Sequence, residues 1–324
     1  MRRDVSLPPE MAGLNIGYVQ QESRYVLTSS CPYCGGGVHP NGEYPDRFVI
    51  FLPKSQNDVT RGWCRNCGKM WFPTGMKLSK EQHTQWLEER RISEEENLQR
   101  VKRALQLLMQ EKKWLTYHDN LNGEVRQYLS NRRIDEFWME YWKLGLVSSK
   151  KIQTKIGEWV TDAISIPVFE PVTKNVLNIR YRLLNPPTPY DKYRPEHGLP
   201  VPIFVTDYDK PLEGPALVVE GEFKSMTTYI TLDKTDILTV GLPGKTPSQY
   251  VIDQLNKCEP IYLCLDPDAS ETPKSGVSPL ERLKTGLGKE RVRVISLADK
   301  IDDMILRNHL TKSGLEILIK TARR

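Results

Sequence analysis

Two short acidic segments, each at the end of an apolar run, constrain the fold of this chain most. One occupies residues 218–222 with the sequence VVEGE, and the other occupies residues 263–268 with the sequence LCLDPD. Apolar runs that lead directly into carboxylates are typical of buried parallel strands that end at a functional edge. The carboxyl ends of neighbouring parallel strands meet in one crevice. We therefore expect Glu220, Asp266 and Asp268 to lie close together.

Carboxylates that lie close together repel one another unless one is protonated or a cation holds them together. Oxygen ligands suit Mg2+ and Mn2+, the ions that support phosphoryl transfer. A spacing of two residues places Asp266 and Asp268 on one face of an extended strand end, where they can share one or two such ions. Glu220 would either complete the ligand shell or accept a proton.

From Pro215 onward the sequence alternates between strand-like and helix-like segments. The pattern predicts four strands and three intervening helices; the strands are 216–219, 237–240, 261–265 and 292–296, and the helices lie near 224–232, 248–257 and 279–287. Such alternation is typical of a parallel sheet with flanking helices. We therefore predict an α/β fold, and a chain of 324 residues is long enough for more than one domain.

Four of the six cysteines form two Cys-x-x-Cys pairs, Cys31 with Cys34 and Cys64 with Cys67. Two intervening residues let one tight turn direct both sulfur atoms at one metal ion, and two such turns complete a tetrahedral Zn2+ shell. The segment 47–52 between the pairs has the pattern of a strand, so residues 1–78 resemble a zinc ribbon. A pair of redox-active dithiols is the alternative, but no thioredoxin-like strand–helix pattern surrounds the cysteines.

Composition indicates an ordinary soluble protein, with 39% hydrophobic and 27% charged residues. No apolar run approaches the roughly 20 residues of a membrane span, and the first residues lack the apolar core of a signal peptide. We therefore expect a cytoplasmic protein with no membrane partner. Residues 54–155 are rich in Lys and Arg interleaved with Trp and Tyr, which suits single-stranded nucleic acid, although a solvated helical surface is the alternative.

The middle of the chain contains helix start signals. Capping-box patterns at Ser79 and Ser93 predict two successive helices, one ending near Arg90 and the next near Lys113. We interpret residues 79–121 as a helical linker. Farther along, Asp135 is a candidate N-cap for a short helix that ends near residue 145.

After this linker, residues 128–134 have the sequence YLSNRRI, and a Leu-Gly pair follows at 144–145. This passage resembles the one that opens the polymerase core of DnaG-type primases, with Arg133 where the family usually has Gly. Glu220, the Asp-x-Asp pair at 266–268 and Asp302-Asp303 resemble the Toprim signature. The resemblance implies a basic part of the primase core over residues 122–213 and a Toprim catalytic domain with C-terminal helices over 214–324.

The resemblance also implies roles for individual residues. Arg182, Lys192 and Tyr193 match positions that line the groove for template and incoming nucleotide, and a charged hairpin rim is the alternative. Asp302 and Asp303 match the last group of metal ligands. Lys224 stands where the family often has Asp, and it would either lower the number of bound metal ions or bring a phosphate-binding cation into the site.

The function implied is that of a DNA primase of the phage or mobile-element kind. It would join ribonucleoside triphosphates into short RNA primers on single-stranded DNA, with structural Zn2+, catalytic Mg2+ or Mn2+, and a replicative helicase in trans as a candidate partner. A Toprim nuclease is one alternative, and a non-catalytic nucleic-acid-binding protein similar to RecR-type recombination mediators is another. Residues 239–246 nearly match a phosphate-binding loop, but Thr239 replaces its first Gly, so an ATPase is less favoured.

Overall fold

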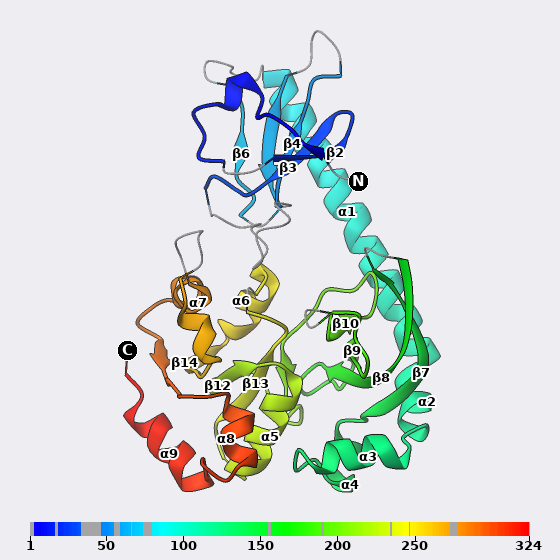
Figure 1. Ribbon diagram of the computed structural model, residues 1–324, viewed down its shortest axis with the longest axis vertical. Coiled ribbons are helices and arrows are strands. Elements are labelled where there is room, and N and C mark those ends of the chain that lie inside the picture. Colours follow the sequence, from blue (N-terminus) through cyan, green and yellow to red (C-terminus); the bar gives the residue numbers. More distant parts are fainter. Residues whose placement is uncertain are drawn as a thin grey trace. The chain divides into compact units, whose positions relative to one another are not determined.

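The computed structural model describes residues 3–16, 19–33, 47–54, 59–65, 67–73, 80–154, 157–188, 191–233, 235–245, 247–272 and 278–323. The chain divides into two compact units, one formed by residues 1–92 with 271–278 and the other by 93–270 with 279–324. Figure 1 shows their helices and strands along the sequence. Across the described ranges, no helix combines the length and the apolar character that a membrane crossing requires.

The first unit is built on one antiparallel sheet. Its described strands run in the order β1-β2-β3-β4-β5-β6; they are β1 (Arg3–Asp4), β2 (Val19–Ser23), β3 (Val26–Ser29), β4 (Phe48–Phe51), β5 (Arg61–Cys64) and β6 (Met70–Trp71). A short 3-10 helix, η1 (Pro9–Met11), precedes β2. Strand β4 confirms the strand expected at 47–52, and Phe48 and Ile50 from it pack with Met11 and Leu27 in a small core.

Helix α1 (Lys80–Glu111) corrects the expectation of two successive helices, because it runs through Ser93 as one element of 32 residues. No Gly or Pro lies between residues 80 and 111, so nothing in the sequence breaks the helix there. An ion pair of 2.7 Å between Arg91 and Glu88 spans one helical turn near the expected break. Farther along α1, Leu105 and Leu108 pack against the second unit's first sheet.

In the second unit, a group of short helices comes first along the chain after α1, and this sheet follows them. The helices are α2 (Lys113–Asp119), α3 (Gly123–Ser130) and α4 (Glu136–Tyr141), and the antiparallel strands are β7 (Gly145–Thr154), β8 (Gly157–Phe169), β9 (Val176–Leu183) and β10 (Tyr193–Pro195) in the order β10-β9-β8-β7. Asp135 caps α4 as predicted, since its carboxylate accepts a hydrogen bond of 3.1 Å from the backbone N–H of Trp138. The helix ends at Tyr141 rather than near residue 145, where β7 begins.

The second sheet of this unit is the predicted parallel one. Its described order is β11-β13-β12-β14-β15, with β11 (Phe204–Val205), β12 (Gly214–Glu220), β13 (Leu238–Leu242), β14 (Cys258–Leu263) and β15 (Val292–Val294). Strands β12, β13, β14 and β15 pair in parallel, which confirms the four predicted strands. The antiparallel strand β11 at the β13 edge was not predicted, and at the other edge Val294 forms a bridge with Arg323.

Helices cover both faces of the parallel sheet (Figure 1). Apolar side chains point to both faces along β12, so each face needs a helical layer to bury them. Ala216 and Val218 pack with α6 (Gln249–Leu255) and α7 (Pro279–Leu287) on one face. Leu217 and Val219 pack on the other face with residues of α5 (Glu222–Leu232), α8 (Ile301–Leu306) and α9 (Lys312–Thr321). Helices α5, α6 and α7 confirm the three predicted ones. The domain boundaries expected after residues 78, 121 and 213 stay predictions.

Candidate active site

The carboxyl edge of the parallel sheet brings three predicted carboxylates together. Glu220 is the last residue of β12, and Asp266 follows the end of the neighbouring strand β14 by three residues. The backbone N–H of Asp266 donates a hydrogen bond of 3.2 Å to Oε1 of Glu220. Carboxylate oxygens of Glu220, Asp266 and Asp268 all lie within 4.8 Å of one another, which is close enough for a shared metal ion.

The turn that leaves β12 explains why Glu220 reaches this edge. Gly221 has a φ of +85°, a backbone conformation that residues with a Cβ rarely adopt, and helix α5 starts directly after it. A Cβ on Gly241 of the adjacent strand would lie 2.7 Å from the carbonyl oxygen of Gly221. The two glycines therefore permit a sharp turn packed tightly against β13.

The backbone around Asp268 differs from the expectation of an extended strand end. Strand β14 ends at Leu263, and residues Pro267–Ser270 form the 3-10 helix η2. Pro267 fixes φ near the helical value, so the chain turns between the two aspartates. Asp266 is consequently buried and Asp268 exposed, although both carboxylates still contribute to the cluster.

Two lysines enter the cluster and pair with its aspartates. Lys224, in the first turn of α5, donates from Nζ to both carboxylate oxygens of Asp266 at 2.5 Å. Lys245, on the loop after β13, pairs with Asp268. Lys245 was missed as a site residue, because its segment was considered only as a phosphate-binding loop. The signal for it lies in the topology, since β13 pairs with β12 and ends at the same edge of the sheet.

These neighbours shift the pKa of two groups in the cluster. Burial and the charge of Asp266 raise the pKa of Glu220, while Lys224 and Lys245 oppose that shift. Burial works against the charged form of Lys245, but its hydrogen bond to Asp268 and the nearby carboxylates outweigh burial and raise its pKa. The cluster thus carries internal cations that partly neutralise the carboxylates.

Asp302 and Asp303 lie in α8 and are not members of this carboxylate group within the described ranges. Asp302 is buried, and its Oδ2 pairs with Nη1 of Arg132 at 3.3 Å. The guanidinium of Arg132 also lies 5.1 Å from the ring centroid of Tyr128. The geometry therefore gives Asp302 an arginine partner and leaves the metal role of both aspartates a prediction.

Two of the residues predicted to line the groove for template and nucleotide, Arg182 and Tyr193, lie side by side. They pair in register between β9 and β10, and the guanidinium of Arg182 lies 5.2 Å from the ring centroid of Tyr193. Burial and the charge of Glu222 raise the pKa of Tyr193. Lys192 is exposed, and its carbonyl oxygen accepts a hydrogen bond of 2.9 Å from the N–H of Leu183.

Arg180 is a second residue that the sequence argument missed. It is buried on β9, and its Nε lies 2.9 Å from Oε1 of Glu222, which begins α5. Its Nη2 donates to the carbonyl oxygen of Pro243 at 3.2 Å. One side chain therefore contacts the turn after Glu220 and the loop that carries Lys245. The signal was the two-residue spacing of Arg180 and Arg182, which places both on one face of a strand.

The first unit contains the predicted thiol cluster in part. Sγ atoms of Cys31, Cys64 and Cys67 lie within 4.8 Å of one another, and those of Cys31 and Cys67 are 3.8 Å apart. Two thiolates bound to tetrahedral Zn2+ at about 2.3 Å would be about 3.8 Å apart. Backbone N–H groups of Tyr33 and Cys67 donate to Sγ of Cys31 and Cys64, each at 3.4 Å. This donor set fits Zn2+; Cys34 lies outside the described residues.

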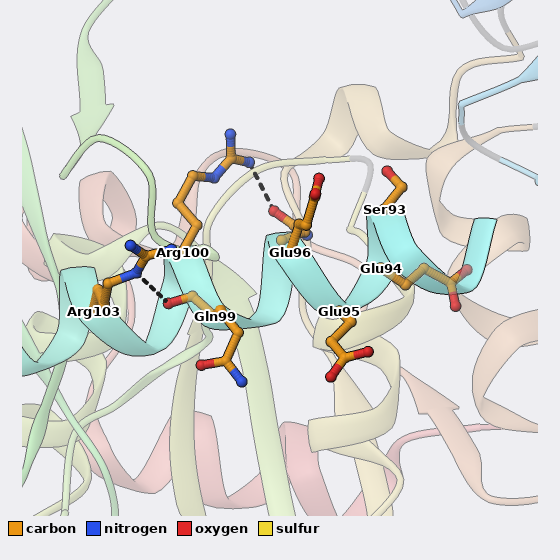
Figure 2. Close-up of a pocket in the computed structure, with 8 residues that line it drawn as sticks. Ser93, Glu94, Glu95, Glu96, Gln99, Arg100 and Arg103 are labelled. Atoms are coloured by element: carbon orange, nitrogen blue, oxygen red, sulfur yellow. Dashed lines mark hydrogen bonds between the residues drawn. The ribbon is translucent and has the colours of Figure 1, made fainter. Parts of the chain in front are cut away.

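A separate hollow along α1 does not qualify as a site. Figure 2 shows its lining residues, whose side chains project from one stretch of a single helix. Arg100 donates to Asn97 at 2.7 Å, and Arg103 donates to the carbonyl oxygen of Gln99 at 3.3 Å. Two arginines of this stretch are thus paired along an exposed helix surface, and the lining side chains do not converge on a common point.

Comparison with solved structures identifies the fold. A solved DnaG catalytic core covers 68% of this chain and 80% of its own, with a TM-score of 0.50 and 15% identity. A second match is the RNA polymerase domain of Mycobacterium tuberculosis primase DnaG, solved with a double-stranded DNA oligomer that carries a 6-nucleotide overhang. The match covers 68% of this chain and 80% of that domain, with a TM-score of 0.50 and 16% identity. A third match, to the zinc-binding and RNA polymerase domains of Aquifex aeolicus primase, covers 96% of this chain and 81% of that one, with a TM-score of 0.48 and 18% identity.

No protein-family model matches the sequence, and no curated protein matches it. At these low identities a structural likeness establishes a fold and leaves the activity to be argued from the site. The likeness to the two DnaG cores covers about two thirds of the chain. That part of the chain therefore has the fold of the catalytic core of DnaG-type primases.

Proposed function

We propose that this protein is a DNA primase that synthesises short RNA primers on single-stranded DNA. The observation that carries the proposal is the convergence of Glu220, Asp266 and Asp268 at the carboxyl edge of a parallel sheet, within the fold of a DnaG catalytic core. In open α/β sheets this edge is where ligands bind. The phage or mobile-element kind and a helicase partner stay predictions.

The three carboxylates would hold Mg2+ or Mn2+. A bound ion of this type supplies charge for the triphosphate and lowers the pKa of an attacking 3′-hydroxyl. Glu220 would either complete the ligand shell of that ion or accept the proton of the hydroxyl. Asp266 is anchored by its backbone hydrogen bond to Glu220 and by Lys224, so its carboxylate has little freedom to move.

The basic strand pair would guide the nucleic acid and the nucleotide. Arg182 presents a planar guanidinium suited to two-pronged phosphate contacts, and Nη1 of Arg182 is buried with no hydrogen-bond partner within the described ranges. Tyr193 holds that guanidinium against its ring. The thiol cluster of the first unit would bind Zn2+ and stabilise a small platform for template contact.

The test is a primer-synthesis assay with the full chain, single-stranded DNA, ribonucleoside triphosphates and Mg2+ or Mn2+. We expect labelled oligoribonucleotides from the wild type and at least about a hundredfold less product from Asp266→Asn. Asp253→Asn, which changes an exposed carboxylate on α6, is the matched control and should retain activity. Equal product from wild type and Asp266→Asn would refute the site assignment. Parallel reactions with deoxynucleotides identify the preferred substrate.

A second candidate function is single-strand binding without catalysis. The pairing of Lys224 and Lys245 with Asp266 and Asp268 favours it, because internal cations can stabilise a carboxylate cluster without a metal ion. Tight binding of single-stranded DNA with no product under either metal would support this function. Cleavage of DNA without added nucleotides would instead support a nuclease.

A further inference from the structure

The two lysines of the acidic cluster occupy different settings. Lys224 is fixed on helix α5, contacts both oxygens of Asp266 and has a side chain that is 16% exposed. Lys245 lies on a loop, contacts one oxygen of the exposed Asp268 and has a side chain that is 41% exposed. The first ion pair is therefore enclosed, whereas the second can separate into solvent at small cost, as exposed ion pairs generally do.

A divalent ion that approaches the cluster competes with the lysines for the same carboxylate oxygens. The ion and an ammonium group also repel each other at short range. Of the two pairs, the exposed one between Lys245 and Asp268 is the easier to separate. Once released, the Lys245 ammonium group stays next to the carboxylates. Its loop follows strand β13, whose last residue pairs in register with Glu220.

We propose that Lys245 is an exchangeable cation, which holds Asp268 before substrate binds and transfers to the phosphate groups of an incoming nucleotide when a divalent ion takes its place. The ammonium group of lysine is a compact point charge with three donors on a flexible stem, which suits movement between a carboxylate and a phosphate. No covalent bond changes in this exchange. The inference rests on the proposed function, since it assigns a nucleotide triphosphate to the same site.

The exchange is tested first by metal binding, with the zinc-loaded full chain titrated with Mn2+ in a calorimeter without nucleotide or DNA. Lys245→Met keeps the length of the stem and removes the competing charge, so we expect Mn2+ to bind about tenfold more tightly. Lys210→Met is the matched control, because Lys210 is 46% exposed and pairs with Asp207 at 3.2 Å; its Mn2+ affinity should equal that of the wild type. Asp268→Asn removes one of the carboxylates, so the part of the binding heat that it loses identifies Mn2+ binding at this cluster.

A second titration uses tripolyphosphate at saturating Mn2+ as a stand-in for the triphosphate of a nucleotide. Lys245→Met should bind this anion about tenfold more weakly than the wild type, because it lacks the released cation. Lys245→Arg keeps the charge and should restore most of that affinity. The signature of exchange is thus a pair of opposite shifts, tighter for the metal ion and weaker for the phosphate.

A purely structural role for Lys245 would shift both affinities in the same direction, and an idle residue would shift neither. Either result would overturn the inference. The thermal unfolding temperature of Lys245→Met should stay within a few degrees of the wild type, and Lys245→Arg provides the second variant if it does not. Primer synthesis by the wild type that disappears in Asp266→Asn supports the proposed function regardless of these titrations, so the two failures are distinguishable.

Discussion

The two units of this protein relate to their candidate metal centres in opposite ways. In the first unit, Cys31 and Cys64 belong to the small hydrophobic core, so two of the sulfur ligands are also core residues. In the second unit, extensive hydrophobic clusters build the sheet and its helices, and the carboxylates project from its edge. A metal ion would complete the fold of the first unit, whereas the fold of the second unit assembles a metal site.

Breaking the thiol cluster should produce the largest effect on stability. Cys64→Ser, or removal of Zn2+ by a chelator, should unfold the first unit, because structural zinc sites contribute on the order of 10 kcal/mol to folding. The second unit should remain folded. Hydrogen exchange read by mass spectrometry would show loss of protection in the strands of the first unit, including β3, β4 and β5, while the strands of the second unit keep theirs. Unchanged protection of these strands after Zn2+ removal would contradict the comparison, and Cys258→Ser, a buried thiol outside the cluster, is the control.

The second unit should depend most on the buried pair of Arg180 and Glu222, whose side chains are 7% and 3% exposed. Arg180→Met leaves the carboxylate of Glu222 buried without a partner and should lower the free energy of unfolding by about 3–5 kcal/mol. Chemical denaturation of the second unit measures this change. The double variant Arg180→Met with Glu222→Leu should recover most of the loss, because both charges are then absent. A single variant as stable as the wild type would show that the pair is dispensable.

Glu196 should make a smaller, pH-dependent contribution to the free energy of unfolding. Burial alone would raise the pKa of its carboxyl group, but hydrogen bonds from Lys113 and Tyr181 outweigh burial and lower it. A lowered pKa stabilises the folded state at a pH above the unfolded value of about 4.5, and this stabilisation is lost as the pH falls through the folded value.

Glu196→Gln should therefore reduce the free energy of unfolding by about 2 kcal/mol at pH 7, and the difference from the wild type should shrink below about pH 4.5. Denaturant unfolding at several pH values measures it. Glu158→Gln removes the exposed partner of Lys151, whose pair spans 3.5 Å, and should change little at any pH. A constant difference across the pH range would rule out the electrostatic cause.

The smallest expected effect concerns a single helix end. Asp135→Ala removes the carboxylate that accepts a hydrogen bond from the N–H of Trp138, and it should cost about 1 kcal/mol. Asp135→Asn keeps an acceptor at the same place and should cost a few tenths of that value. Thermal unfolding distinguishes the two variants. Equal losses would mean that charge, and not the cap itself, stabilises α4.

The parts of the fold that follow from local periodicity and chain direction could be predicted from the sequence. Alternating strand and helix patterns located β12 through β15 and the helices between them. The rule that parallel strands end at one edge of the sheet predicted that Glu220 lies near Asp266. Asp135 was recognisable because a cap depends on residues only three positions away.

Features that depend on tertiary register could not be predicted in the same way. The approach of Lys245 to Asp268 and of Arg180 to Glu222 joins segments that are 23 and 42 residues apart. Sequence patterns place each of these residues on a strand or loop, but they do not predict which distant side chain it meets. The single helix α1 was missed because a capping-box pattern also fits a helix interior. The turn at Asp268 was missed because Pro267 bends the chain after the strand has ended.

The short strand β11 has a consequence for association between molecules. A parallel sheet with an open side presents unpaired N–H and C=O groups, which invite pairing with another chain. Here β11 covers β13 on one side, and the bridge between Val294 and Arg323 partly covers β15 on the other. Backbone hydrogen bonds on both sides of the sheet therefore reduce the number of unpaired groups offered to another chain, and truncation of the last residues should expose those of β15.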